Sequence, residues 1–595
     1  MNLTRKQKRT IDKYYKTKDL RELSSLCGTD TNIIENYLKN NHSSYYHKIN
    51  IVESFDSKSW FKNNYLILIL IFILITIAYA NSLNNKFLSD DIPLIQLNND
   101  LLKFSYIFIR PFIFLRNFFY AIIFKLFGAK EIVFRLMNVF FHIGSCYLFL
   151  LLLSQKFSKK VAVFSTLIFA VHPIIGESIT WISGGYYTQY GFFILLSLFF
   201  YSISLNNKKY LYFSLFAFCL SLLSAERSVI LPLIIVVWEL SFGNIKKNWK
   251  NILPFFIVSS IWVFGYIFGA IQYRIQSLQT SYYQKKVIAN PLTQLPISIS
   301  SYFELLFWPK KLTLYHSEMS YSKFEFTARS LLTFLYFVSI VFTYFKNKKI
   351  FFLLSFFFIT LIPALTPLGI SWVVAERYVY LGSIGIIAVF AFYLEKLLKL
   401  FKSEYLFYFL LAILIAPLTL RTIARNIDWK NQDNLWIASD KYSPNSHQNH
   451  NNLGDYYVRH NNLPKAVVEF QKAIAILPNY ADAYHNMATT FHQMGRDDLA
   501  VESYQKATDY NPNLWQSYQN LGAISFSQGN IKVAQSYFIK ATEVNPQNPV
   551  LHTALGIIYL KAGQKEKGKE ELSKSLMLDP NNQEAKAWYS EANKN

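Results

Sequence analysis

Residues 481–514 read ADAYHNMATTFHQMGRDDLAVESYQKATDYNPNL, and the same pattern returns along residues 445–595. A proline near the end of the pattern recurs every 34 residues, at Pro444, Pro478, Pro512, Pro546 and Pro580. Within each unit the apolar residues follow two helical stripes, and the proline ends the second stripe. A fixed period of this length predicts a stacked array of helix pairs.

Small and large residues occupy matching places in every unit. Small residues stand at the crossing of the two helices, at Gly454, Ala488, Gly522 and Gly556 in the first helix and at Ala466, Ala500, Ala534 and Gly568 in the second. Bulky residues stand beside them, at Phe470, Tyr504, Phe538 and Leu572. Small residues let two helices approach, and large ones fill the remaining gap. This pattern is typical of tetratricopeptide repeats, so we expect an α-solenoid of four repeats and a capping helix over residues 445–595.

The composition indicates that much of the remaining chain faces lipid. Of the 595 residues 52% are hydrophobic and only 16% are charged, too few charges to cover a soluble protein of this size. Apolar runs near the length of a membrane span lie at residues 64–81, 134–153, 161–181, 187–205, 210–225, 228–242, 252–272, 328–345, 350–367, 379–397 and 404–421. We therefore predict an all-α chain with a membrane domain of about eleven spans over residues 64–421, followed by a linker over residues 422–444.

The distribution of positive charge predicts the orientation in the membrane. The net charge is +23, and lysine clusters follow alternate spans, as at Lys156, Lys208, Lys246, Lys346 and Lys396. With eleven spans these clusters share a side with the basic residues 1–63, and the positive-inside rule makes that side the cytoplasm. The interrupted apolar stretches 104–127 and 292–309 are then interfacial helices within external loops 82–133 and 273–327. The repeats lie outside the cytoplasm, and the short loops favour a prokaryotic plasma membrane.

The first 63 residues form a basic cytosolic region with two short helical patterns around Gly28-Thr29-Asp30. A helix-turn-helix that binds DNA and a helical cap whose lysines meet anionic lipid head groups are both compatible with this pattern. The adjacent membrane anchor favours the cap, so we expect no nucleic-acid partner. The three cysteines, Cys27, Cys146 and Cys219, provide neither a disulfide framework nor a metal site.

Ionisable residues gather at the external ends of the spans. Asp90 and Asp91 follow the first span, where a carboxylate could act as a general base. Asp91 also suits a purely structural role as a helix N-cap, because Pro93 follows two residues later. Residues with the chemistry to hold a phosphate or to form buried ion pairs are Arg110, His172, Glu177, Glu226, Arg227, His316, Glu376 and Arg377.

The order of these motifs resembles the transmembrane and tetratricopeptide repeat-containing O-mannosyltransferases, membrane glycosyltransferases of the GT-C class. The motifs are the acidic pair, Arg110-Pro111, Asn138-Val-Phe-Phe-His142, His172-Pro-x-x-x-Glu177-x-x-x-Trp181-x-Ser183-Gly184, Glu376-Arg377-Tyr378 and the repeats. The resemblance implies a lipid-phosphate sugar donor, a hydroxyl acceptor and Asp90 or Asp91 as the base of an inverting transfer. Two positions depart from the family pattern: Ile175 replaces a second histidine, and Glu226-Arg227 replaces Lys-Glu.

The repeats are expected to bind an extended protein segment along their concave face. The groove residues predicted from the repeat register are His485, Thr489, His492, Gln519 and Phe526. The leading hypothesis is a glycosyltransferase that moves a sugar, mannose, from a polyprenyl phosphate to an extracytoplasmic protein hydroxyl or glycan. It needs no metal or other cofactor. The alternative is a non-catalytic membrane scaffold that organises envelope protein complexes through its repeats.

Overall fold

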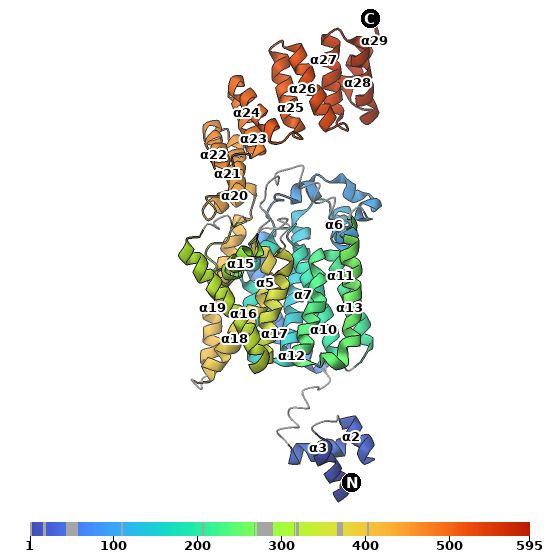
Figure 1. Ribbon diagram of the computed structural model, residues 1–595, viewed down its shortest axis with the longest axis vertical. Coiled ribbons are helices and arrows are strands. Elements are labelled where there is room, and N and C mark those ends of the chain that lie inside the picture. Colours follow the sequence, from blue (N-terminus) through green and yellow to red (C-terminus); the bar gives the residue numbers. More distant parts are fainter. Residues whose placement is uncertain are drawn as a thin grey trace.

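The computed structural model describes residues 3–15, 20–42, 57–108, 111–204, 207–266, 268–269, 290–314, 316, 321–365, 373–400 and 404–594. These residues form helices and turns without a β-strand, which confirms the all-α prediction. Figure 1 shows three parts in sequence: a small N-terminal group of helices, a bundle of long helices, and a curved stack of helix pairs at the opposite end of the bundle.

The N-terminal group consists of α1 (Arg5–Tyr14), α2 (Leu20–Cys27) and α3 (Thr31–Asn41). Thr4 and Gln7 form a capping box at the start of α1, so two backbone N–H groups that the helix leaves unpaired find partners. Gly28 takes a left-handed conformation with a φ of 58° between α2 and α3. The helical hairpin predicted around this glycine is therefore present.

A helix covers most of each of the eleven predicted spans. In chain order these helices are α5 (Ser57–Tyr79), α7 (Glu131–Lys156), α8 (Lys159–Val171), α10 (Tyr186–Ser204), α11 (Lys209–Ser224), α12 (Leu231–Phe242), α13 (Ile245–Tyr266), α16 (Lys323–Lys346), α17 (Lys348–Leu361), α18 (Ser383–Lys399) and α19 (Glu404–Asp428). Within the described residues, four helices are long and apolar enough to cross a membrane alone. A fifth candidate is α8 together with residues 173–180, which bend from it by 51°. The chain is thus an integral membrane protein, and the count of eleven spans stays a prediction.

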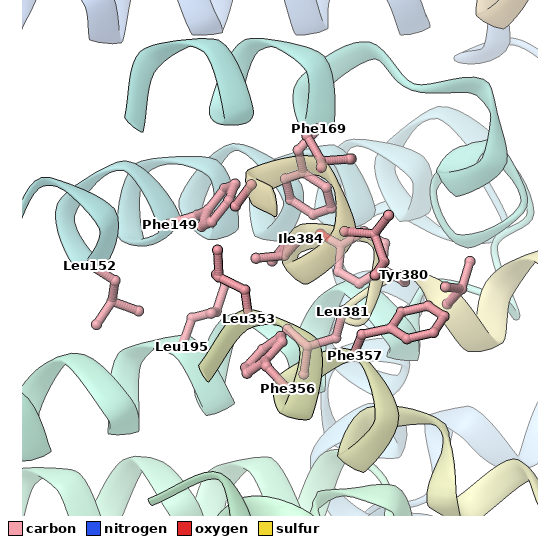
Figure 2. Packing of buried hydrophobic residues seen from close by; sticks show 14 of the residues in the cluster. Phe149, Leu152, Phe169, Leu195, Leu353, Phe356, Phe357, Tyr380, Leu381 and Ile384 are labelled. Atoms are coloured by element: carbon pink, nitrogen blue, oxygen red, sulfur yellow. The ribbon is translucent and has the colours of Figure 1, made fainter. Parts of the chain in front are cut away.

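The bundle core is built from aromatic and branched side chains of α7, α8, α10, α17 and α18. Figure 2 shows these side chains packed between the helices, and Phe149, Phe169, Leu195 and Phe357 are each at most 2% exposed. Close helix contact depends on Gly385 in α18, where an added Cβ would lie 2.4 Å from a backbone oxygen of α17. Interiors packed this densely tolerate little change in volume, so these contacts fix the angles at which the helices enter the functional end.

The basic loops between helices gather at one end of the bundle. The Lys156 amine lies 5.7 Å from the ring centre of Trp238, and the Lys349 amine lies 5.3 Å from that of Phe157. The Ser158 hydroxyl donates to Glu395 over 2.8 Å. The ends of α7, α12, α17 and α18 therefore meet here, at the end of the bundle from which the repeats are most distant (Figure 1). This arrangement agrees with the predicted clustering of positive charge on one membrane side.

The repeat array follows the predicted register, which confirms the solenoid. Its helices are α21 (His447–Arg459), α22 (Leu463–Ile476), α23 (Ala481–Gln493), α24 (Asp497–Tyr510), α25 (Trp515–Ser527), α26 (Ile531–Val544), α27 (Pro549–Lys561), α28 (Lys565–Leu578) and the capping helix α29 (Gln583–Lys594). An added Cβ at Gly454 would lie 2.3 Å from the Phe470 ring, and one at Gly522 would lie 2.5 Å from Phe538. Each bulky residue thus fills the space that the paired small residue leaves.

The predicted linker, residues 422–444, is largely helical. Its first part continues α19 to Asp428, and α20 (Gln432–Asp440) follows. Trp429 and Trp436 are 0% and 3% exposed, because they pack against both the bundle and the first repeat. This burial ties the repeats to the membrane domain.

Candidate active site

The segment that carries the acidic pair is held by a buried arginine of α7. Arg135 is fully buried and donates to the carbonyl oxygens of Lys86 at 2.8 Å and Leu83 at 3.2 Å, and to that of Asn85. Its Nε donates to the carbonyl of Thr180 at 2.9 Å. A guanidinium group has five donors in a rigid plane, so one side chain aligns two distant segments of backbone.

A second clamp comes from the end of α19. The Asn426 amide donates to the Ala78 carbonyl and to the Asn81 side chain, both at 2.7 Å. Its own side-chain oxygen accepts from Thr180 at 2.9 Å, and its backbone carbonyl accepts from the Asn85 amide at 2.9 Å. The segment before the acidic pair therefore connects the first span, the last span and the bent helix pair.

Asp91 is completely buried, and donors surround its carboxylate. Oδ1 accepts from the backbone N–H of Ser183 at 2.7 Å and from the Ser183 hydroxyl, and Oδ2 accepts from the N–H of Leu88 at 3.2 Å. Burial raises the pKa of Asp91 to about 6, although the hydrogen bonds from Ser183 lower it. Asp91 stands at the N-cap position of the short π-helix η3 (Ile92–Gln96), but its side chain does not cap that helix. The predicted N-cap role is thus replaced by a long-range contact.

Asp90 has the opposite surroundings. Its side chain is exposed, and its carboxylate has no hydrogen-bond partner in the described part of the chain. Desolvation raises the pKa of Asp90, while the positive charges of Arg377 and Arg116 lower it. The preceding residue, Ser89, has a φ of 46°, a left-handed conformation that is strained for a serine. Asp90 is therefore the accessible carboxylate, held within electrostatic range of two arginines by a strained turn that Asp91 anchors.

Two of the predicted phosphate ligands flank one tyrosine. The guanidinium carbon of Arg227 lies 4.2 Å from the ring centre of Tyr378, and that of Arg377 lies 5.0 Å from the same ring. Arg377 forms an ion pair with Glu177, whose other carboxylate oxygen accepts from the Arg377 backbone N–H at 2.9 Å. The predicted residues Glu177, Arg227 and Arg377 are thus brought together. The ion pair with Glu177 fixes the position of Arg377.

Arg116 is a site residue that the sequence interpretation missed. It lies on α6 (Phe114–Phe127), with its guanidinium carbon 6.0 Å from the Tyr120 ring centre and 5.8 Å from that of Tyr186. An arginine inside an apolar stretch of an external loop was the available signal, since such charges are costly near lipid. The predicted Arg110 lies outside the described residues.

Glu376 and His316 belong to a separate buried network. Arg425 donates to the two carboxylate oxygens of Glu376 at 3.2 and 3.4 Å and pairs with Asp428 at 2.9 Å. His316 lies 3.7 Å from Glu376. Arg425 and Glu376 are at most 1% exposed, so this network has little contact with solvent and connects the last span to η11 (Glu376–Val379).

His172 has a structural environment. Its Nε2 lies 2.9 Å from the Leu306 carbonyl, and its Nδ1 accepts from the backbone N–H of Ile174 at 3.2 Å. With both ring nitrogens occupied, it secures the bend between α8 and α9 (Gly176–Thr180) and is not brought to the acidic pair. Glu226 is partly exposed next to Arg227 on η8 (Glu226–Ile230).

An apolar cluster connects the acidic segment to the repeats. Leu88 packs with Trp181, Trp429, Trp436 and Leu453, the last of which belongs to the first repeat. The rings of Trp181 and Trp429 are stacked with centres 6.0 Å apart. Leu88 also supplies the backbone donor to Asp91, so the first repeat and the acidic pair share one rigid support.

The predicted groove residues make polar contacts between and within repeats. The His485 ring bonds the Ser517 hydroxyl at 2.8 Å, and Thr489 bonds the Tyr504 hydroxyl at 2.9 Å. His492 is exposed and pairs with Asp497 at 2.6 Å, whereas Gln519 and Phe526 are partly buried. Their role in binding a protein segment stays a prediction. In the described residues no group of three or more His, Cys, Asp or Glu is placed to hold a metal ion.

Comparison with known proteins finds tetratricopeptide repeat families and O-mannosyl-transferases. Family profiles described as TPR repeat and tetratricopeptide repeat match residues 454–495, 481–514 and 525–591. The human protein O-mannosyl-transferase TMTC3 is 23% identical over 412 residues, which is 62% of this chain and 45% of that protein. Drosophila melanogaster protein O-mannosyl-transferase Tmtc2 is 30% identical over 135 residues, 22% of this chain and 14% of that protein. Among solved structures, pilF of Pseudomonas aeruginosa is 25% identical, with a TM-score of 0.23, over 24% of this chain and 67% of that one.

The fold and the comparisons together define an integral membrane protein with a tetratricopeptide repeat array. The matches to TMTC3 and Tmtc2 confirm the predicted resemblance to the transmembrane and tetratricopeptide repeat-containing O-mannosyltransferase family. The chain matches less than half the length of these curated relatives.

Proposed function

We propose that this chain is a membrane glycosyltransferase that moves mannose from a polyprenyl-phosphate carrier to a hydroxyl of an extracytoplasmic protein or glycan. The observation that carries the proposal is an exposed Asp90 carboxylate within electrostatic range of Arg377 and Arg116, in a turn that the buried Asp91 anchors. The names of the related O-mannosyl-transferases support the reaction class, and the repeats supply a surface for a protein acceptor.

Asp90 acts as the general base in this reaction. A serine or threonine hydroxyl is protonated at neutral pH and becomes an effective nucleophile when a carboxylate accepts its proton during attack. The hydroxyl oxygen forms the new bond to the anomeric carbon of the sugar as the bond from that carbon to the phosphate oxygen breaks. The proton goes to Asp90, the electron pair leaves with the lipid phosphate, and the anomeric configuration inverts.

The arginines balance the charge of the leaving phosphate. Arg377 and Arg116 both act on Asp90 electrostatically, and Arg227 shares the Tyr378 ring with Arg377. Guanidinium groups bind phosphate oxygens in pairs of parallel hydrogen bonds, and this interaction strengthens as negative charge develops. Unlike Arg377, Arg227 and Arg116 have no carboxylate partner in the described residues, so their guanidinium groups are available to a donor phosphate.

The acceptor approaches from the repeats. The cluster around Leu88 and Trp181 joins the first repeat to the acidic segment, so a protein segment bound along the array would emerge near Asp90. This arrangement requires the repeats and the acidic pair to share the extracytoplasmic side of the membrane, with residues 1–63 in the cytoplasm. A prokaryotic plasma membrane is the proposed location.

The decisive experiment measures sugar transfer by the purified chain from radiolabelled polyprenyl-phosphate mannose, glucose and N-acetylglucosamine to acceptor peptides. We expect transfer from the mannose donor by the wild type, with Asp90→Asn lowering the rate by about 10²–10⁴-fold and leaving donor binding nearly unchanged. Arg227→Gln should weaken donor binding as well as turnover. If well-folded Asp90→Asn and Asp91→Asn variants both transfer at the wild-type rate, the scaffold alternative replaces this proposal.

A further inference from the structure

A second site with the character of a lipid-binding groove lies apart from the acidic pair. It is a cavity of about 470 Å³ between α8, α15 (Pro291–Phe307), α18 and α19. Its interior is formed by apolar side chains, among them Ile168, Ile387, Leu414 and Leu418. The α19 wall belongs to a helix that is long and apolar enough to cross the membrane.

Two cations stand at one end of this groove. Arg421 and Lys310 both line it. The Nε and Nη2 groups of Arg421 each donate over 3.2 Å to backbone carbonyls of residues 309 and 310. These bonds fix the guanidinium plane and leave its Nη1 unpaired within the described residues. Lys310 is exposed beside it. The groove thus combines an apolar channel with a positively charged mouth.

The length of the groove matches that of a lipid head group and its first methylenes. Leu414 and Arg421 are seven residues apart on α19, which corresponds to about 10 Å at 1.5 Å per residue. Trp308 and Phe307 at the mouth are 70% and 56% exposed. Exposed aromatic rings next to a lysine are typical of the membrane–water interface, where amphipathic side chains are anchored.

We propose that this groove binds an anionic phospholipid, with its phosphate on Arg421 and Lys310 and the start of one acyl chain along Leu414 and Leu418. The positive mouth selects a lipid with net negative charge over a zwitterionic one. Neither Asp90 nor the arginines that act on it, Arg377 and Arg116, line this groove, so the phospholipid proposed here is distinct from the sugar donor. This inference therefore does not depend on the proposed transferase activity.

The bound lipid would support the bend that precedes the site. His172 lines the groove and bonds the Leu306 carbonyl at 2.9 Å, so the groove wall is continuous with the contact that secures the bend before α9. A lipid that fills this space would prevent the end of α15 from moving away from α8.

The test is native mass spectrometry of the full chain in detergent, titrated with phosphatidylglycerol or with phosphatidylcholine. We expect one tightly held phosphatidylglycerol, a preference over phosphatidylcholine of about tenfold or more, and loss of that preference in Lys310→Gln and Arg421→Gln. Lys130→Gln removes an exposed charge elsewhere and should leave binding within about twofold. Equal binding of the two lipids by the wild type would overturn the proposal.

A second pair of variants tests the apolar part without changing charge. Leu418→Trp places a larger side chain inside the groove and should exclude the acyl chain, whereas Leu420→Trp, on a side chain that is 67% exposed, should not. Equal retention of phosphatidylglycerol by the two variants would show that the lipid binds elsewhere. Polyprenyl phosphate provides the last comparison. If it displaces phosphatidylglycerol at lower concentration, the groove holds a prenyl carrier and the assignment to a phospholipid is wrong.

Discussion

Catalysis by Asp90 and positioning by Asp91 can be tested separately. One variant changes Asp90, and another removes a hydrogen-bond donor to Asp91. Asp90→Asn keeps the size of an exposed side chain and removes its charge. Ser183→Ala leaves both aspartates in place and removes the hydroxyl that donates to Asp91, while the backbone N–H of Ser183 still donates at 2.7 Å. The first variant tests chemistry, and the second tests positioning.

The expected changes in stability follow from burial. Burial raises the pKa of Asp91 to about 6, so this carboxylate is mostly ionised at pH 7.5. Removing one hydrogen bond to a buried charged group should cost about 1.5–3 kcal/mol, the expected loss for Ser183→Ala. The Asp90 side chain makes no hydrogen bond within the described residues. Asp90→Asn should therefore change the free energy of unfolding by no more than about 0.5 kcal/mol.

For activity the expected order is reversed: Asp90→Asn should have the larger effect and Ser183→Ala the smaller one. Asp90→Asn should slow transfer by about 10²–10⁴-fold, because no other carboxylate is exposed at this turn to accept the proton. The activity that remains at saturating donor in Ser183→Ala should exceed that of Asp90→Asn. The wild-type rate should fall as the pH is lowered through the pKa of Asp90, which desolvation raises above 3.8, since protonated Asp90 cannot act as a base.

Thermal unfolding in detergent and initial rates of transfer from labelled donor, measured on the same preparations, give both quantities. An Asp90→Asn variant that is as stable as the wild type and as fast would refute the assignment of Asp90. A Ser183→Ala variant that keeps full stability would show that the Asp91 contact contributes nothing to folding. If Asp90→Asn were active and Asp91→Asn inactive at equal stability, the two roles would have to be exchanged.

Three further predictions address topology, register and pH. A reporter active only outside the cytoplasm should work when fused after Asn595 and fail after Lys209, and the reverse result would invert the span count. Ala500 is fully buried, so Ala500→Leu in the isolated fragment 440–595 should cost about 1–3 kcal/mol, whereas exposed Lys506→Ala should cost less than about 0.5 kcal/mol; equal thermal shifts would contradict the register. Burial alone would lower the pKa of His450, but hydrogen bonds to a carboxylate and a carbonyl raise it above 6.5. Its stabilising contribution is then complete below pH 6.5 and is lost as the pH rises through the raised pKa, so His450→Gln should flatten the decline in thermal stability above pH 6.5.

The repeats could be predicted almost residue by residue, because their stabilising contacts are local and recur. Phe470 meets Gly454 within one helix pair, and Phe538 meets Gly522 in the same way 68 residues later. The same reasoning located a helix for each apolar run of the bundle. It could not say how long each helix is, since bends such as the one at His172 depend on a carbonyl at Leu306, 134 residues away.

The sequence predicts the residue types of the candidate site, but it does not predict which of these residues contact each other. Glu177 and Arg377 are 200 positions apart, and nothing in the spacing of either motif indicates that they form an ion pair. Arg116 was missed for the same reason, because its significance comes from proximity to Asp90 and to the tyrosines around it. Polar residues at span ends can be found from sequence, whereas their pairing depends on how the helices pack.

The two aspartates have different roles, and these roles depend on contacts between residues that are distant in the sequence. Local rules give Asp91 a competing structural role as an N-cap, which would leave Asp90 as the base. The local reason does not hold, because the Asp91 side chain makes no capping hydrogen bond. It is instead occupied by Ser183, 92 residues further along the chain, and by the backbone before it. A carboxylate whose oxygens are filled by buried donors has little capacity left for an incoming hydroxyl proton, whereas an adjacent exposed carboxylate keeps that capacity. The pairing of a buried aspartate with an exposed one therefore gives a reason for two acidic residues to stand side by side: one fixes the turn, and the other is free to react.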